Sequence, residues 1–329
     1  MRRLLKYLFW IILALVLIFV FLSFRAVPEK ITYGVSFSTL HALELGLDWK
    51  AVYEAMLQDL QVKNLRLSAY WQDIEPKDGV FDYSNMDFQM SEAKRAGASV
   101  IFSVGRRLPV WPECHAPEWE WSLDKETGER KLLEYIEKTV NRYKNYGNIT
   151  YWQVENEPFF TIYAKEWCKP FDESFLKKEI ELVKKLDPAH PVLLTDSGEL
   201  GTWWGAKRDG DVFGSSLYLY AWNQTFGQFR YPITPAYYRI RQNIADLVFG
   251  KKKNILSELS LEPWLLTPIK DAPIDLQLSR MDIAKFNSII TFAKTTSFGE
   301  QYLWGVEWWY YMKQNGHPEF WDAAKVIFK

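Results

Sequence analysis

After Ile31 the chain alternates short apolar runs with helical stretches, and each apolar run ends in polar or aromatic residues. This alternation predicts parallel strands joined by crossover helices, and therefore an α/β sheet. With 329 residues, the chain has room for one (β/α)8 barrel of about 250 residues with elaborated loops, or for two smaller domains. The eight strand-like runs lie at 31–37, 63–68, 98–105, 151–155, 191–198, 211–218, 254–259 and 301–309.

The fourth and seventh runs each end at a glutamate. The fourth stops at the pair Asn156-Glu157 and is broken by Pro158, because a proline cannot continue a central strand. The pair is therefore placed at the carboxyl end of a parallel strand, where (β/α)8 proteins carry their chemistry. The seventh run ends at Glu258, and Glu262 follows four residues later. We prefer Glu258 as the functional carboxylate because the apolar run ends directly at it.

These motifs, in this order, resemble the clan A glycoside hydrolases, retaining (β/α)8 enzymes of the cellulase and β-glycosidase type. In that clan an Asn-Glu pair ends strand four and a second glutamate ends strand seven. A strand-end arginine of the clan is commonly followed by Glu-Pro-x-x-Gly-x-Phe/Tyr-Asp, and here Arg66 precedes Glu75-Pro76 and the segment 79–83. The resemblance covers nearly the whole chain after Ile31 and does not assign one family of the clan.

The resemblance implies a role for each strand-end residue in retaining hydrolysis of a glycosidic bond. Glu157 is the acid/base and Glu258 the nucleophile, while Asn156 binds the 2-hydroxyl of the sugar. Arg66 and Tyr218 hold the Glu258 carboxylate. The open alternative for Arg66 is an ion pair elsewhere in the barrel core, since a buried arginine needs a carboxylate partner in both cases. This chemistry needs no metal or organic cofactor.

One further position and two sets of alternatives rest on the same resemblance. A tryptophan at the end of strand eight forms the floor of the −1 sugar site in the clan, and Trp308 is the expected match, with Trp309 and Trp304 as alternatives. Tyr220 is the alternative to Tyr218.

Other polar residues after the strands are further candidates for substrate contacts. His115, in the loop after strand three, is expected to bond a sugar hydroxyl, or else to hold the loop backbone. Asp196 and Glu199 follow strand five and are candidates for substrate contacts, whereas Asp196 could equally cap a helix or loop.

Several tryptophans lie in polar, loop-like stretches, where exposed rings would suit the apolar faces of sugars. They are Trp71, Trp111, Trp119, Trp121, Trp203, Trp204 and Trp222.

The chain has two cysteines, Cys114 and Cys168, without the spacing of a zinc site. They fall in the loops after strands three and four, which are neighbours on one face of a barrel. We therefore predict a disulfide between them, which an exported protein can form.

The amino terminus carries a basic segment followed by an apolar one. Residues 1–6 include Arg2, Arg3 and Lys6, and residues 7–24 form an uncharged run of 18 residues. A run of this length is at the short end of what spans a bilayer and exceeds the core of a cleavable signal peptide. We expect a signal anchor over 7–24, a cytoplasmic start at 1–6, a tether at 25–30 and a catalytic barrel at 31–329 outside the cytoplasm. The alternative is a secreted protein after cleavage.

The net charge of −1 and pI of about 6.5 give no field that attracts nucleic acid. We expect a carbohydrate partner and a monomeric catalytic domain.

Two other functions stay open from the sequence. One is a transglycosylase, which uses the same residues with a sugar acceptor, and the other is a silent carbohydrate-binding barrel. A lyase or isomerase on the same fold would need a lysine or metal cluster at the strand ends, and none is evident.

Overall fold

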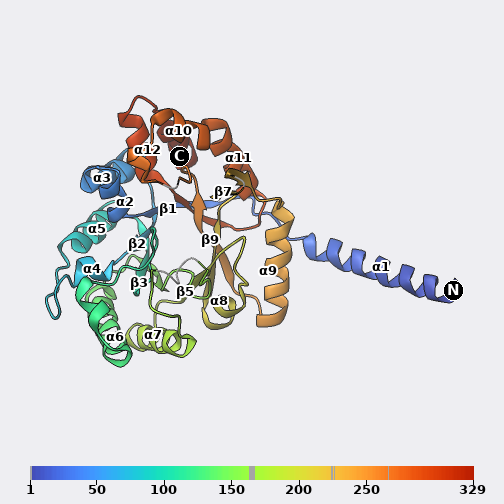
Figure 1. Ribbon diagram of the computed structural model, residues 1–329, viewed down its shortest axis with the longest axis horizontal. Helices are drawn as coiled ribbons and strands as arrows, with labels where there is room; N and C mark the ends of the chain where they lie inside the picture. The colour runs from blue at the N-terminus through green and yellow to red at the C-terminus, as the bar shows by residue number, and fades with distance from the viewer. Residues whose placement is uncertain (1, 163–166, 224, 226, 266) are drawn as a thin grey trace.

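The computed structural model describes residues 2–162, 167–223, 225, 227–265 and 267–329. Eight parallel strands close into a barrel in the order β1-β10-β9-β6-β5-β4-β3-β2, with helices packed around it (Figure 1). The predicted barrel fold is confirmed. The barrel strands are β1 (Thr32–Phe37), β2 (Asn64–Ser68), β3 (Ser99–Val104), β4 (Ile149–Val154), β5 (Val192–Asp196), β6 (Val212–Leu217), β9 (Lys253–Ser260) and β10 (Glu300–Trp304).

The outer elements follow the strands in turn, and most helices present one apolar face to the barrel. α3 begins after the N-cap Asp48, whose carboxylate accepts the Lys50 N–H. The helices are α1 (Arg2–Ser23), α2 (Thr39–Glu44), α3 (Trp49–Gln58), α4 (Trp71–Ile74), α5 (Ser84–Arg95), α6 (Lys125–Tyr143), α7 (Glu173–Leu186), α8 (Trp204–Asp209), α9 (Pro235–Phe249), α10 (Ile274–Arg280), α11 (Ile283–Lys294), α12 (Val306–Gln314) and α13 (Glu319–Ile327), with short 3₁₀ helices η1 (Glu118–Ser122) and η3 (Ile269–Asp271).

Buried side chains fill the barrel interior, so it is a packed core and not a channel. Gly34 on β1 shows how tight this filling is, because a Cβ there would lie 2.6 Å from the Tyr302 ring. The inner cluster consists of Ile101, Tyr151, Leu193, Val212, Ile255 and Tyr302. A larger apolar layer lies between the strands and the surrounding helices.

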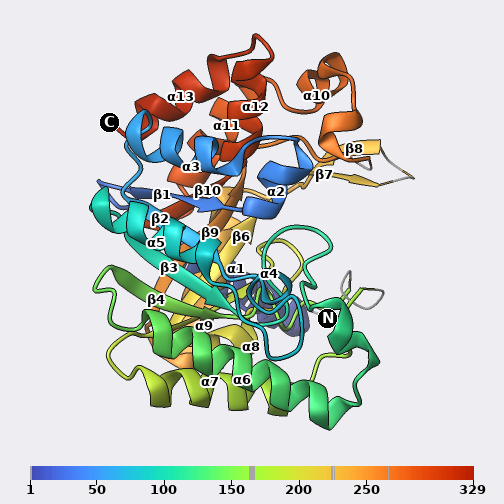
Figure 2. The same cartoon turned by 90° about the vertical axis from the view of Figure 1, so that its left-hand side faces the viewer.

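Loops gather at the carboxyl ends of the strands. The short α4, the antiparallel hairpin β7 (Tyr220–Asn223) and β8 (Gly227–Arg230), and α10 all lie toward that end (Figure 2). The hairpin follows β6 directly and was not expected from the sequence. This end of the barrel is where the predicted site residues emerge.

The predicted disulfide is present. Cys114, in the loop after β3, is bonded to Cys168, in the loop after β4, with the two Cα atoms 5.4 Å apart. The bridge joins two long loops beside the strand ends that carry Glu157 and its neighbours.

Replacing both cysteines by serine is expected to lower the free energy of unfolding. The bridge spans 54 residues of sequence, and cross-linking a loop of that length restricts the unfolded chain by about 2–4 kcal/mol. Urea denaturation of the double variant measures the loss, with the reduced wild-type chain as the control. An unchanged midpoint would show that the loops are held by their other contacts alone.

Candidate active site

The site is organised around the guanidinium of Arg66 on β2, which is 1% exposed. Its Nη1 donates to Oε2 of Glu258 on β9 at 2.7 Å, and its Nη2 donates to Oδ1 of Asn156 at 2.7 Å. Its Nε donates to Oε1 of Gln153 on β4 at 2.8 Å. Arg66 thus joins β2, β4 and β9 at one end of the barrel, and the predicted contact between Arg66 and Glu258 is present.

The second oxygen of Glu258 is held from β6. The hydroxyl of Tyr218, the residue after β6, donates to Oε1 of Glu258. Burial, together with the negative charge of Glu258, raises the pKa of Tyr218 well above its ordinary value, so the phenol keeps its proton. A carboxylate bound by a guanidinium and a phenol has its charge balanced and its orientation fixed.

The chain turns sharply where β4 ends. Glu155 and Glu157 have positive φ angles of 57° and 45°, a backbone conformation that costs free energy and is often found at functional sites. The Glu155 carboxylate anchors this turn, because it accepts the backbone N–H groups of Arg106 at 2.8 Å and Arg107 at 2.6 Å. Gly105 leaves room for that carboxylate, since a Cβ there would lie 2.6 Å from Oε1 of Glu155.

Arg107 holds the same turn from the loop after β3. Its Nη1 donates to the carbonyls of Glu157 at 3.0 Å and Phe160 at 2.6 Å. Its Nε and Nη2 both donate to Oε2 of Glu113, at 2.8 and 2.6 Å. Arg107 therefore fixes the backbone of Glu157 and places the charge of Glu113 close to it.

Glu157 is buried, with 8% of its surface exposed. Its backbone N–H donates to Oγ1 of Thr195 on β5 at 2.9 Å. Burial, then the negative charges of Glu113 and Glu258, raise the pKa of Glu157 well above its ordinary value. Its carboxyl group is therefore set up to carry a proton beside a second carboxylate.

Asn156 is fixed by its oxygen. Oδ1 accepts from Arg66 and, at 3.3 Å, from Oγ1 of Thr195. Within the part of the chain that the structure describes, no acceptor holds its Nδ2 amide. That group is available to donate to a ligand.

Glu262, the competitor of Glu258, belongs to another cluster. Its Oε2 lies 2.7 Å from Nε2 of His41, and its Oε1 accepts from Nε1 of Trp304 at 2.7 Å. Although burial opposes it, the carboxylate of Glu262 holds the pKa of His41 well above its usual value. Glu262 is thus engaged in an ion pair and lacks the arginine and tyrosine that bind Glu258.

The expectation that Trp308 ends strand eight is wrong. β10 ends at Trp304, and Gly305 at φ 117° turns the chain into α12, which contains Trp308. Trp308 is fully buried, packs on Phe320 and donates from Nε1 to Oε1 of Gln277 at 2.8 Å. It is a core residue, and the alternative Trp304 stands at the strand end, stacked against His41.

His115 contacts the backbone of its own loop, which is the alternative to binding a sugar hydroxyl. The ring is 3% exposed, and its Nε2 lies 3.0 Å from the Val110 carbonyl. Burial lowers the pKa of His115 to about 4, so the ring is neutral at pH 7. Because the ring is buried and its Nε2 is bonded to its own loop, His115 is poorly placed to bind a sugar hydroxyl.

Asp196 and Glu199 also hold protein groups. Asp196 is fully buried and accepts the backbone N–H of Trp203 at 2.6 Å, where α8 begins, as in the capping alternative. Oε1 of Glu199 accepts the backbone N–H of Tyr218 at 2.9 Å and the hydroxyl of Tyr238. Glu199 therefore positions the tyrosine that binds Glu258.

The loop tryptophans differ in exposure, and Trp119 and Trp222 are half-buried. Trp71 and Trp203 are buried, whereas Trp111 is 60% exposed and its ring meets that of Trp167, which is 49% exposed, edge to face. Trp111 and Trp167 lie close in sequence to Cys114 and Cys168, so the disulfide holds this aromatic pair together. Other exposed rings are Trp121, Trp204 and Trp264.

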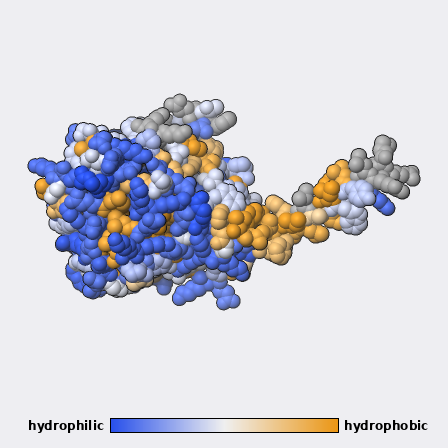
Figure 3. Space-filling view, turned by 90° about the horizontal axis from the view of Figure 1, so that it is seen from below, coloured by the Kyte–Doolittle hydropathy of each residue, from blue (hydrophilic) through white to orange (hydrophobic). Residues whose placement is uncertain are grey.

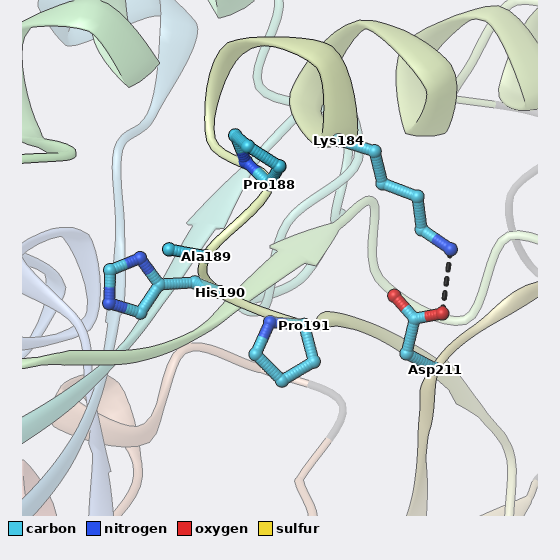
Figure 4. Close-up of a pocket in the computed structure, with 6 residues that line it drawn as sticks. All are labelled: Lys184, Pro188, Ala189, His190, Pro191 and Asp211. Carbon is cyan, nitrogen blue, oxygen red and sulfur yellow. Dashed lines mark hydrogen bonds and ion pairs between the residues drawn. The ribbon is translucent and has the colours of Figure 1, made fainter.

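A surface hollow of about 480 Å³ lies at the other end of the barrel (Figure 4). Lys184 and Asp211 line it and form an ion pair of 2.6 Å. Asp211 directly precedes β6, whereas Tyr218 directly follows that strand. The hollow therefore lies at the opposite ends of the strands from the Arg66 cluster.

Known structures share this fold at low sequence identity. Xylanase 10B from Thermotoga petrophila, solved in complex with xylobiose, aligns at TM-score 0.55 and 15% identity over 84% of this chain and 82% of that one. A β-galactosidase from a Rahnella species aligns at TM-score 0.56 and 12% identity over 84% of this chain. An exo-β-1,4-mannosidase from an Opitutaceae bacterium aligns at TM-score 0.56 and 14% identity over 85% of it. The chain spans about half of the galactosidase and mannosidase, at 50% and 53%.

The sequence itself matches one family. The profile of glycosyl hydrolase family 10 matches residues 37–208, more than half of the 329 residues. The matched segment includes Arg66, Asn156 and Glu157 and ends before Glu258. With the barrel and the two buried glutamates at its carboxyl end, this match identifies the chain as a glycoside hydrolase that belongs to glycosyl hydrolase family 10.

Proposed function

We propose that the enzyme cleaves its glycosidic bond with retention of anomeric configuration, with Glu258 as the nucleophile and Glu157 as the acid/base. The observation that carries the proposal is the different environment of the two carboxyl groups. Glu258 is bound through both oxygens by Arg66 and Tyr218, whereas burial and nearby negative charges favour the protonated form of Glu157. Such a pair, with one carboxyl group oriented by an arginine and a tyrosine and the other set up to carry a proton, is what a retaining glycosidase needs.

In the first step an oxygen of Glu258 attacks the anomeric carbon as the bond to the leaving oxygen breaks. Glu157 gives its proton to that oxygen, and a glycosyl ester on Glu258 forms. The Nδ2 amide of Asn156 donates to the 2-hydroxyl, a contact that strengthens in the transition state.

In the second step the charge balance is reversed. Esterification removes the negative charge of Glu258, which is one cause of the raised pKa of Glu157. Glu157 can then remain ionised, take a proton from water and direct the resulting hydroxide at the anomeric carbon. The ester bond breaks, and the sugar leaves with its original configuration.

The substrate class we propose is a β-linked oligo- or polysaccharide. Two structural neighbours, a β-galactosidase and an exo-β-1,4-mannosidase, are named for β-glycosidic bonds and support this class. The exposed rings of Trp111 and Trp167 beside the strand ends support it too. Aromatic faces of this kind pack against the apolar faces of sugar rings.

The proposal extends to the amino terminus, with residues 1–6 in the cytoplasm, 7–24 as a transmembrane anchor, 25–30 as a tether and the domain 31–329 outside. The segment Lys6–Ser23 of α1 is long and apolar enough to cross a bilayer, with a mean hydropathy of 2.5. The disulfide favours an oxidising compartment.

Glu199→Ala is expected to lower kcat about ten- to a hundredfold, the worth of one hydrogen bond to a charged group. The carboxylate orients Tyr218 through its backbone N–H, and a displaced Tyr218 would hold Glu258 less well. KM should change little, and Glu199→Gln should recover most of the activity because an amide oxygen still accepts. Equal losses in both variants would contradict a positioning role.

The mechanism is tested by following the hydrolysis of an aryl β-glycoside by proton NMR. The sugar released first should be the β anomer, which then mutarotates. Initial release of the α anomer would overturn the retaining mechanism. A product extended by an added sugar acceptor would instead favour transglycosylation.

A further inference from the structure

The apolar helix α1 ends against α9, on the side of the barrel (Figure 1). Nδ2 of Asn243 donates to the carbonyls of Leu22 at 2.8 Å and Phe24 at 3.2 Å. Nε of Arg239 donates to the carbonyl of Ser23 at 2.9 Å. The last carbonyls of a helix lack partners within it, and here α9 supplies them.

The residue that follows this junction is tied to a buried charge network. Nη1 of Arg25 donates to Asn243 at 2.9 Å and to Asp246 at 2.8 Å. Asp246 also binds Nζ of Lys207 at 2.6 Å, and the Lys207 side chain is fully buried. Arg25 thus binds the same carboxylate, Asp246, that the buried Lys207 holds. A freely moving tether would not make this contact, so the anchor and the domain are joined in one fixed arrangement.

The outer face of α9 beside this junction is apolar. Leu247, one turn after Asn243, is 80% exposed, and Val248 is 56% exposed. Ile240 and Ile244, half-buried, continue this stripe toward the start of α9. Figure 3 shows α1 as an apolar rod that leaves a largely hydrophilic domain, with apolar atoms around the point of departure. Exposed apolar side chains that continue from a membrane span are placed where the hydrocarbon boundary lies.

We propose that α9 is a second membrane contact, and that the lipid bilayer covers its Leu247 and Val248 side chains while Arg25 holds the domain against it. The inference rests on the membrane anchor proposed above. Because α1 leaves the ring of helices sideways (Figure 1), the barrel lies on its side at the membrane. The carboxyl ends of its strands, with Glu157 and Glu258, then open along the membrane surface, toward polysaccharide that lies parallel to it.

The test uses the full chain in vesicles of phosphatidylcholine with one fifth phosphatidylglycerol, with a nitroxide on one introduced cysteine. Both native cysteines are in the disulfide, so the label is specific. Leu247→Cys is compared with Leu43→Cys, a leucine that is 55% exposed on α2, across the ring from α9. Power saturation measures collision with oxygen, which dissolves in lipid, against a water-soluble nickel chelate. The label at 247 should favour oxygen over nickel, and the label at 43 should favour nickel.

Arg25→Ala tests the charge network, with Lys30→Ala as its matched control. The structure places no carboxylate within ion-pair distance of Lys30 among the residues that it describes. Arg25→Ala should lose the preference of the 247 label for oxygen and keep hydrolysis of a soluble aryl glycoside, and Lys30→Ala should change neither. Resistance of the wild-type chain to an alkaline carbonate wash reports the anchor separately. If the wash leaves the chain in the membrane but the label at 247 favours nickel, as the label at 43 does, the α9 contact alone is overturned. If the wash releases the chain, the anchor itself is overturned.

Discussion

Glu258→Ala is expected to slow the hydrolysis of an aryl β-glycoside by roughly 10⁴–10⁶-fold, the range found when a member of a covalent catalytic unit is removed. The reason is that the intermediate is an ester of this carboxylate. Arg66 and Tyr218 would remain around an empty space without an attacking oxygen. The measurement is kcat on a dinitrophenyl glycoside, with circular dichroism to show that the variant is folded.

Azide should restore part of that activity, because a small anion can enter the space left by the carboxylate. It would attack in a single displacement and give the α-glycosyl azide from a β-glycoside. Glu262→Gln is the matched control, since Glu262 lies four residues later and is held by His41 and Trp304. It should keep measurable turnover and need no azide. Full activity in Glu258→Ala would sink the assignment.

Glu157→Ala is expected to have an effect that depends on the leaving group and on pH. An acid catalyst contributes about 10²–10⁴-fold, so hydrolysis of a sugar–sugar bond should fall by that factor, and formation of the intermediate from a dinitrophenyl glycoside should fall far less. In the wild type, kcat/KM should decline as the pH rises through the raised pKa of Glu157, because the ionised group has no proton to donate. The variant should lose this alkaline decline.

The stereochemistry of azide rescue separates the two glutamates. In Glu157→Ala, azide would attack the ester on Glu258 without the help of a base and give the β-glycosyl azide. The α product there, or an alkaline decline that persists in the variant, would contradict the role of Glu157.

The sequence was sufficient for the fold and for the central contacts of the site. Most barrel strands are short apolar runs that end in polar residues, and parallel strands bring their carboxyl ends together. The pairing of Arg66 with Glu258, 192 positions apart, came from the resemblance to clan A, in which a strand-end arginine holds the nucleophile. The preference for Glu258 over Glu262 rested on which residue ends the apolar run, and Arg66 binds the former.

The predictions that were wrong or missing have physical causes as well. The run 301–309 has large apolar residues on both sides of Gly305, so its composition does not show where β10 stops, and the turn depends on the positive φ of Gly305. Trp308 was misplaced for that reason. Glu155, Glu113 and Glu199 were missed as supports because their partners are backbone N–H groups or loop residues. Such contacts leave no periodic signal, although a glutamate two residues before Glu157 could have drawn attention.

The central claim is that Glu258 forms the covalent intermediate. A 2-fluoro glycoside with a good leaving group should inactivate the enzyme, because the fluorine slows both the formation and the hydrolysis of the ester, whereas the good leaving group speeds its formation alone. Proteolysis and mass spectrometry of the inactivated chain then locate the sugar. The account predicts a single modified peptide with the sugar on Glu258, and a sugar on Glu262, or on any other residue, would contradict it.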